Sequence, residues 1–159
     1  EGYPLGFFFC LVEIVVVSKK ISTRQQELFR KEAEERGLPK PKFIIDNVRN
    51  VIPTLPRIDI FYYRGDSPGE GGSGIFMLGK KWLSRILEHF PEKNGLIITD
   101  GNNCNKKQFR RMIQPGGYYW SSMGWKFTRL LPTPNPEIGG LYVLNVERVV
   151  AEEVLGSSA

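Results

Sequence analysis

The sequence predicts an α/β fold with an open, mostly parallel sheet, helices on both faces and a C-terminal antiparallel hairpin. Strand-like and helix-like segments alternate along the 159 residues, which is typical of parallel sheets. The run VEIVVV (12–17) is rich in β-branched residues, as expected for a strand buried on both faces. Near the end, the strand-like runs 125–131 and 140–149 are joined by a link rich in proline and glycine, which favours an antiparallel pair.

The first predicted helix follows that buried strand. Ser22 and Thr23 are candidate N-caps because each has a glutamine three residues later, the spacing of a capping box. The helix should run through QQELFRKEAEER and end at Gly37, since glycine commonly ends helices. Two further strands are then predicted, KFIID (42–46) and RIDIFYY (57–63).

The second half repeats the alternation. A helix is predicted over 75–90, where an apolar stripe recurs at helical spacing: Ile75, Leu78, Trp82, Ile86 and Phe90. GLIITD (95–100) is the next strand, and NKKQFRRMIQ (105–114) is a short helix that Pro115 and two glycines terminate. We therefore predict one domain over 1–150 and a C-terminal tail over 151–159.

Composition bounds the possible partners. The net charge of +5 and the pI near 9.3 permit an anionic partner, although a solvated basic face explains the same charge. His89 is the one histidine, and the two cysteines, Cys10 and Cys104, form no CxxC motif. A zinc site and a histidine-based triad therefore both lack parts, and we expect no metal.

The apolar segment LGFFFCLVEIVVV does not predict a membrane protein. It is short and contains Glu13, whereas a spanning helix needs about 20 apolar residues. It also lacks the basic flank of a signal peptide. We therefore expect a cytoplasmic protein with no membrane partner.

Candidate ligand-binding residues follow from the predicted sheet. In open α/β sheets, ligands bind beyond the carboxyl ends of the strands. The side chains just past those ends are the ones to weigh: Ser18, Lys19, Asp46, Asn47, Arg64, Gly65, Asp66, Asp100, Gly101 and Asn102.

The order of these elements resembles that of the class I (Rossmann-like) S-adenosylmethionine-dependent methyltransferases. The residues that carry the resemblance are VEIVVVSKK, a helix ending EERGLP, KFIIDN, RIDIFYYRGD, FPEKNGLIITDG and the closing hairpin GWKFTRLLPTPNPEIGGLYVLNVERV. The resemblance covers about residues 1–149. It implies a Rossmann-like domain that binds S-adenosylmethionine and transfers its methyl group to an unidentified acceptor.

The resemblance also assigns the cofactor-binding residues. Only Glu1 and Gly2 are left to match the end of the family's glycine-rich cofactor loop, and the strand before that loop is missing. Either the domain lacks its first strand, or the chain is a fragment, or the cofactor is bound differently. Ser18 and Lys19 stand where the family usually has an acidic residue for the ribose, and lysine cannot accept those hydrogen bonds.

The same resemblance implies further roles past the next strands. Asp46, followed by Asn47, matches the acidic position that contacts the adenine amino group. Arg64 and Asp66 occupy the fourth-strand position of substrate-side residues, and Asp66 or Asp100 would orient the nucleophile as a catalytic residue.

The loop after 57–63 offers a competing interpretation. Its glycines Gly69, Gly71 and Gly74 spell G-x-G-x-x-G between a strand and a helix, the context of a dinucleotide-binding fingerprint. Asp100 would then bind the ribose of NAD(P) in an oxidoreductase. A turn capped by Ser73 explains the same residues without a dinucleotide, as a substrate-side loop.

A third interpretation is a non-catalytic Rossmann-like module that binds nucleic acid or a protein. The segment PGGYYWSSMGW lies close to basic residues, and Arg110, Arg111 and Trp120 are the candidate nucleic-acid contacts. Aromatic and basic side chains together can stack bases and hold phosphates. The structural alternative is that half of these aromatic side chains are core residues.

Overall fold

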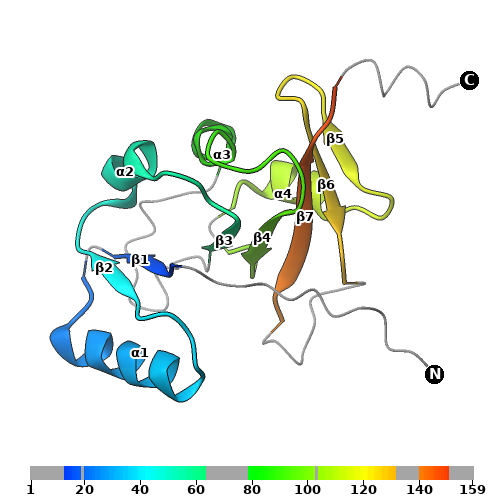
Figure 1. Ribbon diagram of the computed structural model, residues 1–159. Helices are drawn as coiled ribbons and strands as arrows, with labels where there is room; N and C mark the ends of the chain where they lie inside the picture. The colour runs from blue at the N-terminus through cyan, green and yellow to red at the C-terminus, as the bar shows by residue number, and fades with distance from the viewer. Residues whose placement is uncertain (1–12, 19, 64–78, 103, 132–139, 151–159) are drawn as a thin grey trace, which may run out of the picture. The chain divides into compact units, whose positions relative to one another are not determined.

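A computed structural model describes residues 13–18, 20–63, 79–102, 104–131 and 140–150. The chain falls into two compact units, Glu1–Thr54 and Leu55–Ala159. We refer to them as unit 1 and unit 2 and describe each by itself (Figure 1).

Unit 1 contains a two-stranded parallel sheet. Strand β1 (Val15–Val17) pairs with β2 (Lys42–Ile44), with Val16 opposite Phe43. Both strands lie in segments that the sequence predicts as strands, and their parallel pairing agrees with the predicted crossover through a helix.

Helix α1 (Thr23–Glu35) makes that crossover. Ser22 is its N-cap and forms a full capping box with Gln25, because the side chain of each accepts a hydrogen bond from the backbone N–H of the other. Past the helix, Gly37 has φ +65°, a left-handed conformation that glycine adopts at low cost. The sequence prediction of this helix and of both its ends is confirmed.

Two short helical turns end unit 1. Helix α2 (Val48–Val51) begins after its N-cap Asn47, and a 3₁₀ turn (Ile52–Thr54) follows directly. Val51 and Ile52 are buried. The sequence did not predict either turn.

Unit 2 is built on a five-stranded sheet with the order β3-β4-β7-β6-β5. Its strands are β3 (Ile60–Tyr63), β4 (Gly95–Thr99), β5 (Tyr118–Trp120), β6 (Trp125–Arg129) and β7 (Tyr142–Arg148). Only β3 and β4 pair in parallel, and the β4–β7, β7–β6 and β6–β5 pairs are antiparallel. The expectation of a mostly parallel sheet is therefore wrong for this unit, while the predicted C-terminal hairpin, β6–β7, is confirmed.

Strand β7 lies inside the sheet, between β4 and β6 (Figure 1). Because it is antiparallel to both neighbours, β6 runs in the same direction as β4. After β4 the chain thus passes over two strand positions to form β5, and β6 and β7 fill those positions on the way back. Strand β5 forms the far edge of the sheet and was not predicted.

The helices of unit 2 are α3 (Lys80–Leu87) and α4 (Lys106–Met112). Helix α3 buries Leu83, Ile86 and Leu87, whereas Trp82, which the predicted stripe placed in the core, is half-buried. The predicted core position of Trp82 is therefore wrong. Ile75 and Leu78 lie outside the described residues.

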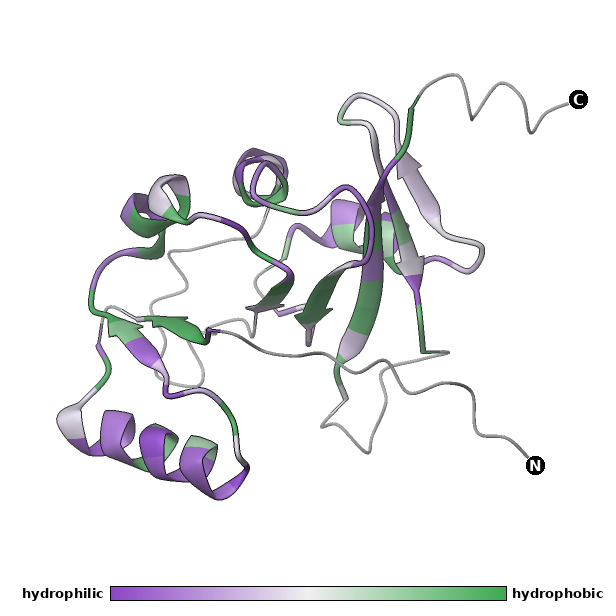
Figure 2. Ribbon diagram, in the orientation of Figure 1, coloured by the Kyte–Doolittle hydropathy of each residue, from purple (hydrophilic) through white to green (hydrophobic). Residues whose placement is uncertain are grey.

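The core of unit 2 lies on the central strands. Its fully buried apolar side chains include Ile97 of β4, Phe127 of β6, and Leu144 and Val146 of β7, with Leu83, Ile86 and Leu87 of α3 beside them in the core. The hydrophobic colour of β4 contrasts with the hydrophilic colour along most of α1 (Figure 2). Burial of apolar surface is the main contribution to stability here.

Candidate functional sites

The first candidate site lies past the carboxyl ends of β1 and β2. The backbone N–H of Ser18 donates to the carbonyl of Ile44 at 3.1 Å, which extends the parallel pairing by one bond. The Ser18 hydroxyl oxygen accepts a hydrogen bond from the Lys20 N–H at 3.3 Å. Ser18 is thereby held beside the end of β2, as the predicted cofactor position requires.

Asp46 and Asn47 organise the start of α2. Asp46 Oδ1 accepts from the Asn47 N–H at 2.6 Å and from Asn50 Nδ2 at 3.1 Å. The Asn47 side chain caps α2 by accepting from the Arg49 N–H at 3.0 Å. Asn47 therefore has a structural role. Asp46 is an exposed residue, and within the described part of the chain its second carboxylate oxygen, Oδ2, makes no hydrogen bond.

A second candidate position follows β4 in unit 2. Both carboxylate oxygens of Asp100 accept hydrogen bonds from Asn102, Oδ1 from the backbone N–H at 2.9 Å and Oδ2 from Nδ2 at 3.1 Å. The buried Thr99 hydroxyl accepts from the Gly101 N–H at 3.1 Å. These contacts fix a tight turn, so the Asp100 carboxylate already has a structural role and gives the dinucleotide interpretation no support.

Helix α4 packs on this turn. A Cβ at Gly101 would lie 2.5 Å from Phe109 Cε1, and the Phe109 ring meets that of Tyr142 edge-on at 5.1 Å. Beside the turn, burial raises the pKa of the Cys104 thiol to about 11, and the Asp100 carboxylate contributes to the rise. A thiol with a raised pKa is mostly protonated and unreactive at neutral pH.

The most distinctive feature of unit 2 is a groove of about 470 Å³. It is lined by the start of α3, by α4, by β5 and by the turn after β5. The lining residues are Lys80, Asn105, Lys107, Gln108, Arg111, Tyr118, Trp120, Ser121 and Ser122. We call this the basic groove, because it has three cationic side chains and no carboxylate.

The two aromatic side chains of the basic groove differ in exposure. Trp120 is only 7% exposed and packs near the fully buried Phe127, with ring centroids 6.4 Å apart. Tyr118 is half-buried and stacks on Phe127 at 6.3 Å. Tyr118 therefore has ring surface to offer a ligand, while Trp120 belongs to the wall of the groove.

Of the predicted nucleic-acid contacts, Arg111 and Trp120 line the basic groove. Arg110 is exposed on α4 but does not line it. The sequence analysis missed Lys80, Ser121 and Ser122 in this role. The available signal was the pair of lysines that begins α3, which resembles the pair that begins α4.

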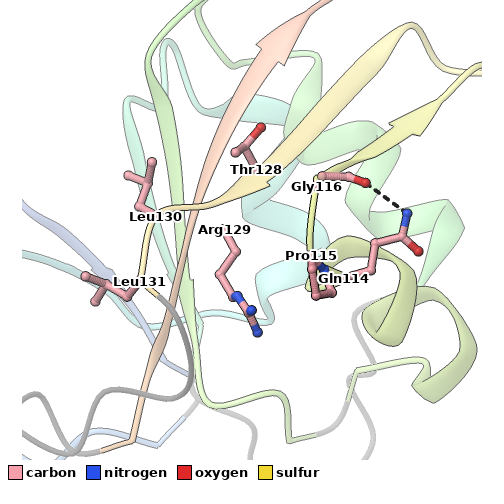
Figure 3. A pocket seen from close by; sticks show the side chains of 8 residues that line it. Gln114, Pro115, Gly116, Thr128, Arg129, Leu130 and Leu131 are labelled. Carbon is pink, nitrogen blue, oxygen red and sulfur yellow. Dashed lines mark hydrogen bonds between the residues drawn. The ribbon is translucent and has the colours of Figure 1, made fainter.

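A second hollow, of about 370 Å³, lies between the end of α4 and the end of β6. Figure 3 shows the Arg129 side chain pointing towards Pro115 and away from Thr128. Gln114 Nε2 donates to the Gly117 carbonyl at 2.8 Å and closes the turn after α4. With one cationic side chain in its lining, this hollow has fewer groups for recognising an anion than the basic groove.

Several predicted site residues lie outside the described part of the chain. These are the cofactor-side residues Glu1, Gly2 and Lys19, the substrate-side residues Arg64 and Asp66, and the loop residues Gly69, Gly71, Ser73 and Gly74. Their assignments stay predictions.

The described residues contain no group of three or more His, Cys, Asp or Glu side chains that could hold a metal ion. Among the same residues, no helix has the length and apolar character needed to cross a membrane.

No protein-family model matches the sequence, and no curated protein matches it. Among solved structures, the chain is similar to an rRNA methylase from Streptococcus thermophilus, with a TM-score of 0.42 and 12% sequence identity. The match covers 87% of this chain and 88% of that one. A likeness at this level carries no conclusion about ligand or activity.

Proposed function

We propose that the chain is an S-adenosylmethionine-dependent methyltransferase-like domain whose cofactor site includes the carboxyl ends of β1 and β2. The observation that carries the proposal is the environment of Asp46. One of its carboxylate oxygens organises α2 through Asn47 and Asn50, and the other makes no hydrogen bond to the described residues, in a side chain that is exposed. A carboxylate oxygen left in this way can accept a hydrogen bond from the adenine amino group.

The strand arrangement of unit 2 supports the same proposal at the level of fold. The methyltransferase resemblance implies a sheet closed by a final helix and a β-hairpin. Here α4 precedes β6 and β7, and β7 pairs with β4. Because one fold serves many functions, the proposal depends on the Asp46 site and not on this arrangement.

When bound, S-adenosylmethionine would supply a methyl group on its sulfonium. The acceptor would take this methyl group by in-line displacement, and the sulfur would leave as a neutral thioether. The chain's contribution is to position the two reactants. We assign Ser18 and Asp46 to the cofactor and Arg64 and Asp66 to the acceptor. Asp100 is better assigned to the turn after β4, since Asn102 engages both of its oxygens.

The test is calorimetric titration of the protein with S-adenosylmethionine. The Asp46→Asn variant keeps an oxygen that can accept from Asn47 and Asn50, but it removes the charge and puts an amide donor in place of the free oxygen. We expect affinity to fall by roughly 10-fold or more, the effect of leaving one polar group unpaired.

The matched control is Asp59→Asn, because Asp59 is an exposed carboxylate in unit 2 that pairs with Arg57 at 2.7 Å. It should bind the cofactor as the unmodified protein does. Absence of heat at millimolar cofactor, or equal losses in the two variants, would contradict the proposal.

A further inference from the structure

We infer that the basic groove binds single-stranded nucleic acid through its phosphates. This inference does not depend on the proposed methyl transfer, because no groove residue is assigned to the cofactor. It rests on the charge of the groove, on the absence of ion pairs to that charge within the described part of the chain, and on the spacing of the cations.

Among the residues that the structure describes, the cations of the groove have no paired carboxylate. Lys80, Lys107 and Arg111 make no ion pair within the described residues, whereas the pairs that occur there use other cations. No acidic residue lies in the first turn of α3 or α4. An anion from another molecule is therefore the partner that this charge fits.

The position of the lysines adds to the same conclusion. Lys80 is the first residue of α3, and Lys107 is the second residue of α4. A helix N-terminus carries a partial positive charge, so a lysine there costs a few tenths of a kcal/mol up to about 1 kcal/mol. A bound phosphate would relieve this repulsion.

The spacing of cations along α4 favours a polymer over a single phosphate. Lys107 and Arg111, which both line the basic groove, form an i,i+4 pair on α4. They are separated by about 6 Å along the helix axis, and Lys80 lines the same groove from α3. A chain of phosphates can contact several of these cations at once, which a free phosphate cannot do.

The remaining lining favours a single strand over a duplex. Ser121, Ser122 and Gln108 supply neutral hydrogen-bonding groups beside the cations, and Tyr118 supplies a half-buried ring. Flexible single strands can follow a charged groove and stack a base on an aromatic side chain. The bases of a duplex are already stacked on each other, so none of them is free to stack on the Tyr118 ring.

The test measures fluorescence anisotropy of a labelled 12-nucleotide oligouridine between 50 and 200 mM salt (about the range in which phosphate contacts are resolved). Three phosphate contacts to a single strand predict a slope of log K on log salt of about −2, or roughly a 20-fold loss over this range. The triple variant K80Q/K107Q/R111Q should reduce the slope by about 2 and weaken binding at the lower salt concentration by tenfold or more.

The matched control is R24Q/K40Q/K93Q, which removes the same number of charges from exposed positions outside the groove. It should keep the slope of the unmodified protein. Circular dichroism and the unfolding midpoint of each variant show whether the fold is kept, and Tyr118→Leu should weaken oligouridine binding without changing the slope.

Three outcomes would overturn the inference. One is an equal loss of affinity in the two triple variants, which would make binding an effect of net charge. Another is tighter binding of a duplex of the same length. The last is equal binding of an acidic peptide, which would indicate a protein partner. Because Asp46→Asn should leave oligouridine binding intact, failure of the cofactor proposal is separable from failure of this one.

Discussion

Helices α1 and α4 are both strongly charged, and they balance their charges in opposite ways. In α1, Lys31 pairs with Glu35 at 3.8 Å, and just past its end Arg36 pairs with Glu32 at 2.6 Å. In α4, the sequence KKQFRRM has four cations and no carboxylate. The charges of α1 are therefore largely balanced by carboxylates of the same helix, whereas α4 has no carboxylate of its own.

The two helices also differ in how they are held. The one buried residue of α1 is Ala33, and Leu28 on the same helix is 57% exposed. Helix α4 buries Met112, which is 3% exposed, and places Phe109 against Tyr142. Apolar contacts thus stabilise α4 although its four cationic side chains repel one another. This is the pattern expected of a helix whose charged side chains bind a ligand while its apolar side chains supply stability.

The largest expected effect comes from removing the apolar anchor of α4. Met112→Ala should lower the free energy of unfolding of unit 2 by about 2–5 kcal/mol, because it leaves a cavity in a packed interior. Leu28→Ala in α1 should change stability by no more than about 0.5 kcal/mol.

Denaturant titration separates the two effects. All three tryptophans, Trp82, Trp120 and Trp125, lie in unit 2, so their fluorescence follows Met112→Ala, while far-ultraviolet circular dichroism follows Leu28→Ala. Equal losses in the two variants would remove the distinction between a packed α4 and a lightly anchored α1.

A smaller effect is expected at the turn beneath α4. Gly101→Ala should cost about 1–3 kcal/mol, because the residue has φ +80° and its new Cβ would strike the Phe109 ring. Gly116→Ala is the matched control, since Gly116 has φ +83° and no atom within 4 Å of the added Cβ. If both variants unfold at the same denaturant concentration, the close approach of Phe109 contributes nothing beyond backbone strain.

The smallest expected effect has opposite signs in the two helices. Lys107→Glu should stabilise α4 by several tenths of a kcal/mol, because it places a carboxylate in the first turn and four residues before Arg111. Glu32→Lys in α1 should destabilise by about 0.2–0.5 kcal/mol, since it breaks the pair with Arg36.

Binding provides the contrast to these stability changes. Lys107→Glu should weaken oligouridine binding while raising the thermal midpoint, and Glu32→Lys should lower the midpoint without weakening binding. A Lys107→Glu variant that is less stable would show that Lys107 has a structural partner.

Local elements could be predicted from the sequence because their signals are local. Ser22 and its glutamine three residues later mark the start of α1, and the β-branched run marks β1. Strand β5, Tyr118–Trp120, was missed because it lies between glycines and serines and not in a longer β-branched run such as the one that marks β1. Its aromatic residues are equally consistent with a loop.

Strand direction and order could not be predicted in the same way. The parallel expectation for the sheet rests on alternation of elements, but the direction of β7 beside β4 depends on where the chain returns after β6. In the predicted stripe of α3, Ile86 and Phe90 are buried as expected, and only the core position of Trp82 was wrong among the described members. A helix such as α3 offers neighbouring apolar stripes, and the one containing Leu83 and Leu87 is the one buried.

The candidate sites differ in the same way in how far the sequence indicated them. Asp46 could be named as a candidate because it directly follows a recognisable strand. The basic groove was found only in part, since Lys80 lies 27 positions before Lys107 in the sequence, and packing alone brings them to one groove. A run of basic residues such as KKQFRRM is visible in a sequence, but the concave surface that collects it is not.

The place of β7 between β4 and β6 has a consequence for how the chain folds during synthesis. Strand β4 pairs with residues 142–146. The backbone N–H and C=O groups along one edge of this apolar strand therefore stay without a partner until almost the whole described chain has left the ribosome. Pairing at such sequence separation is slow, because a long loop must close before any contact rewards it. During that interval, the unpaired backbone groups of the strand edge can pair with strands of other chains. Strand β7, the last strand among the described residues, is therefore the one that covers this edge of the nascent protein.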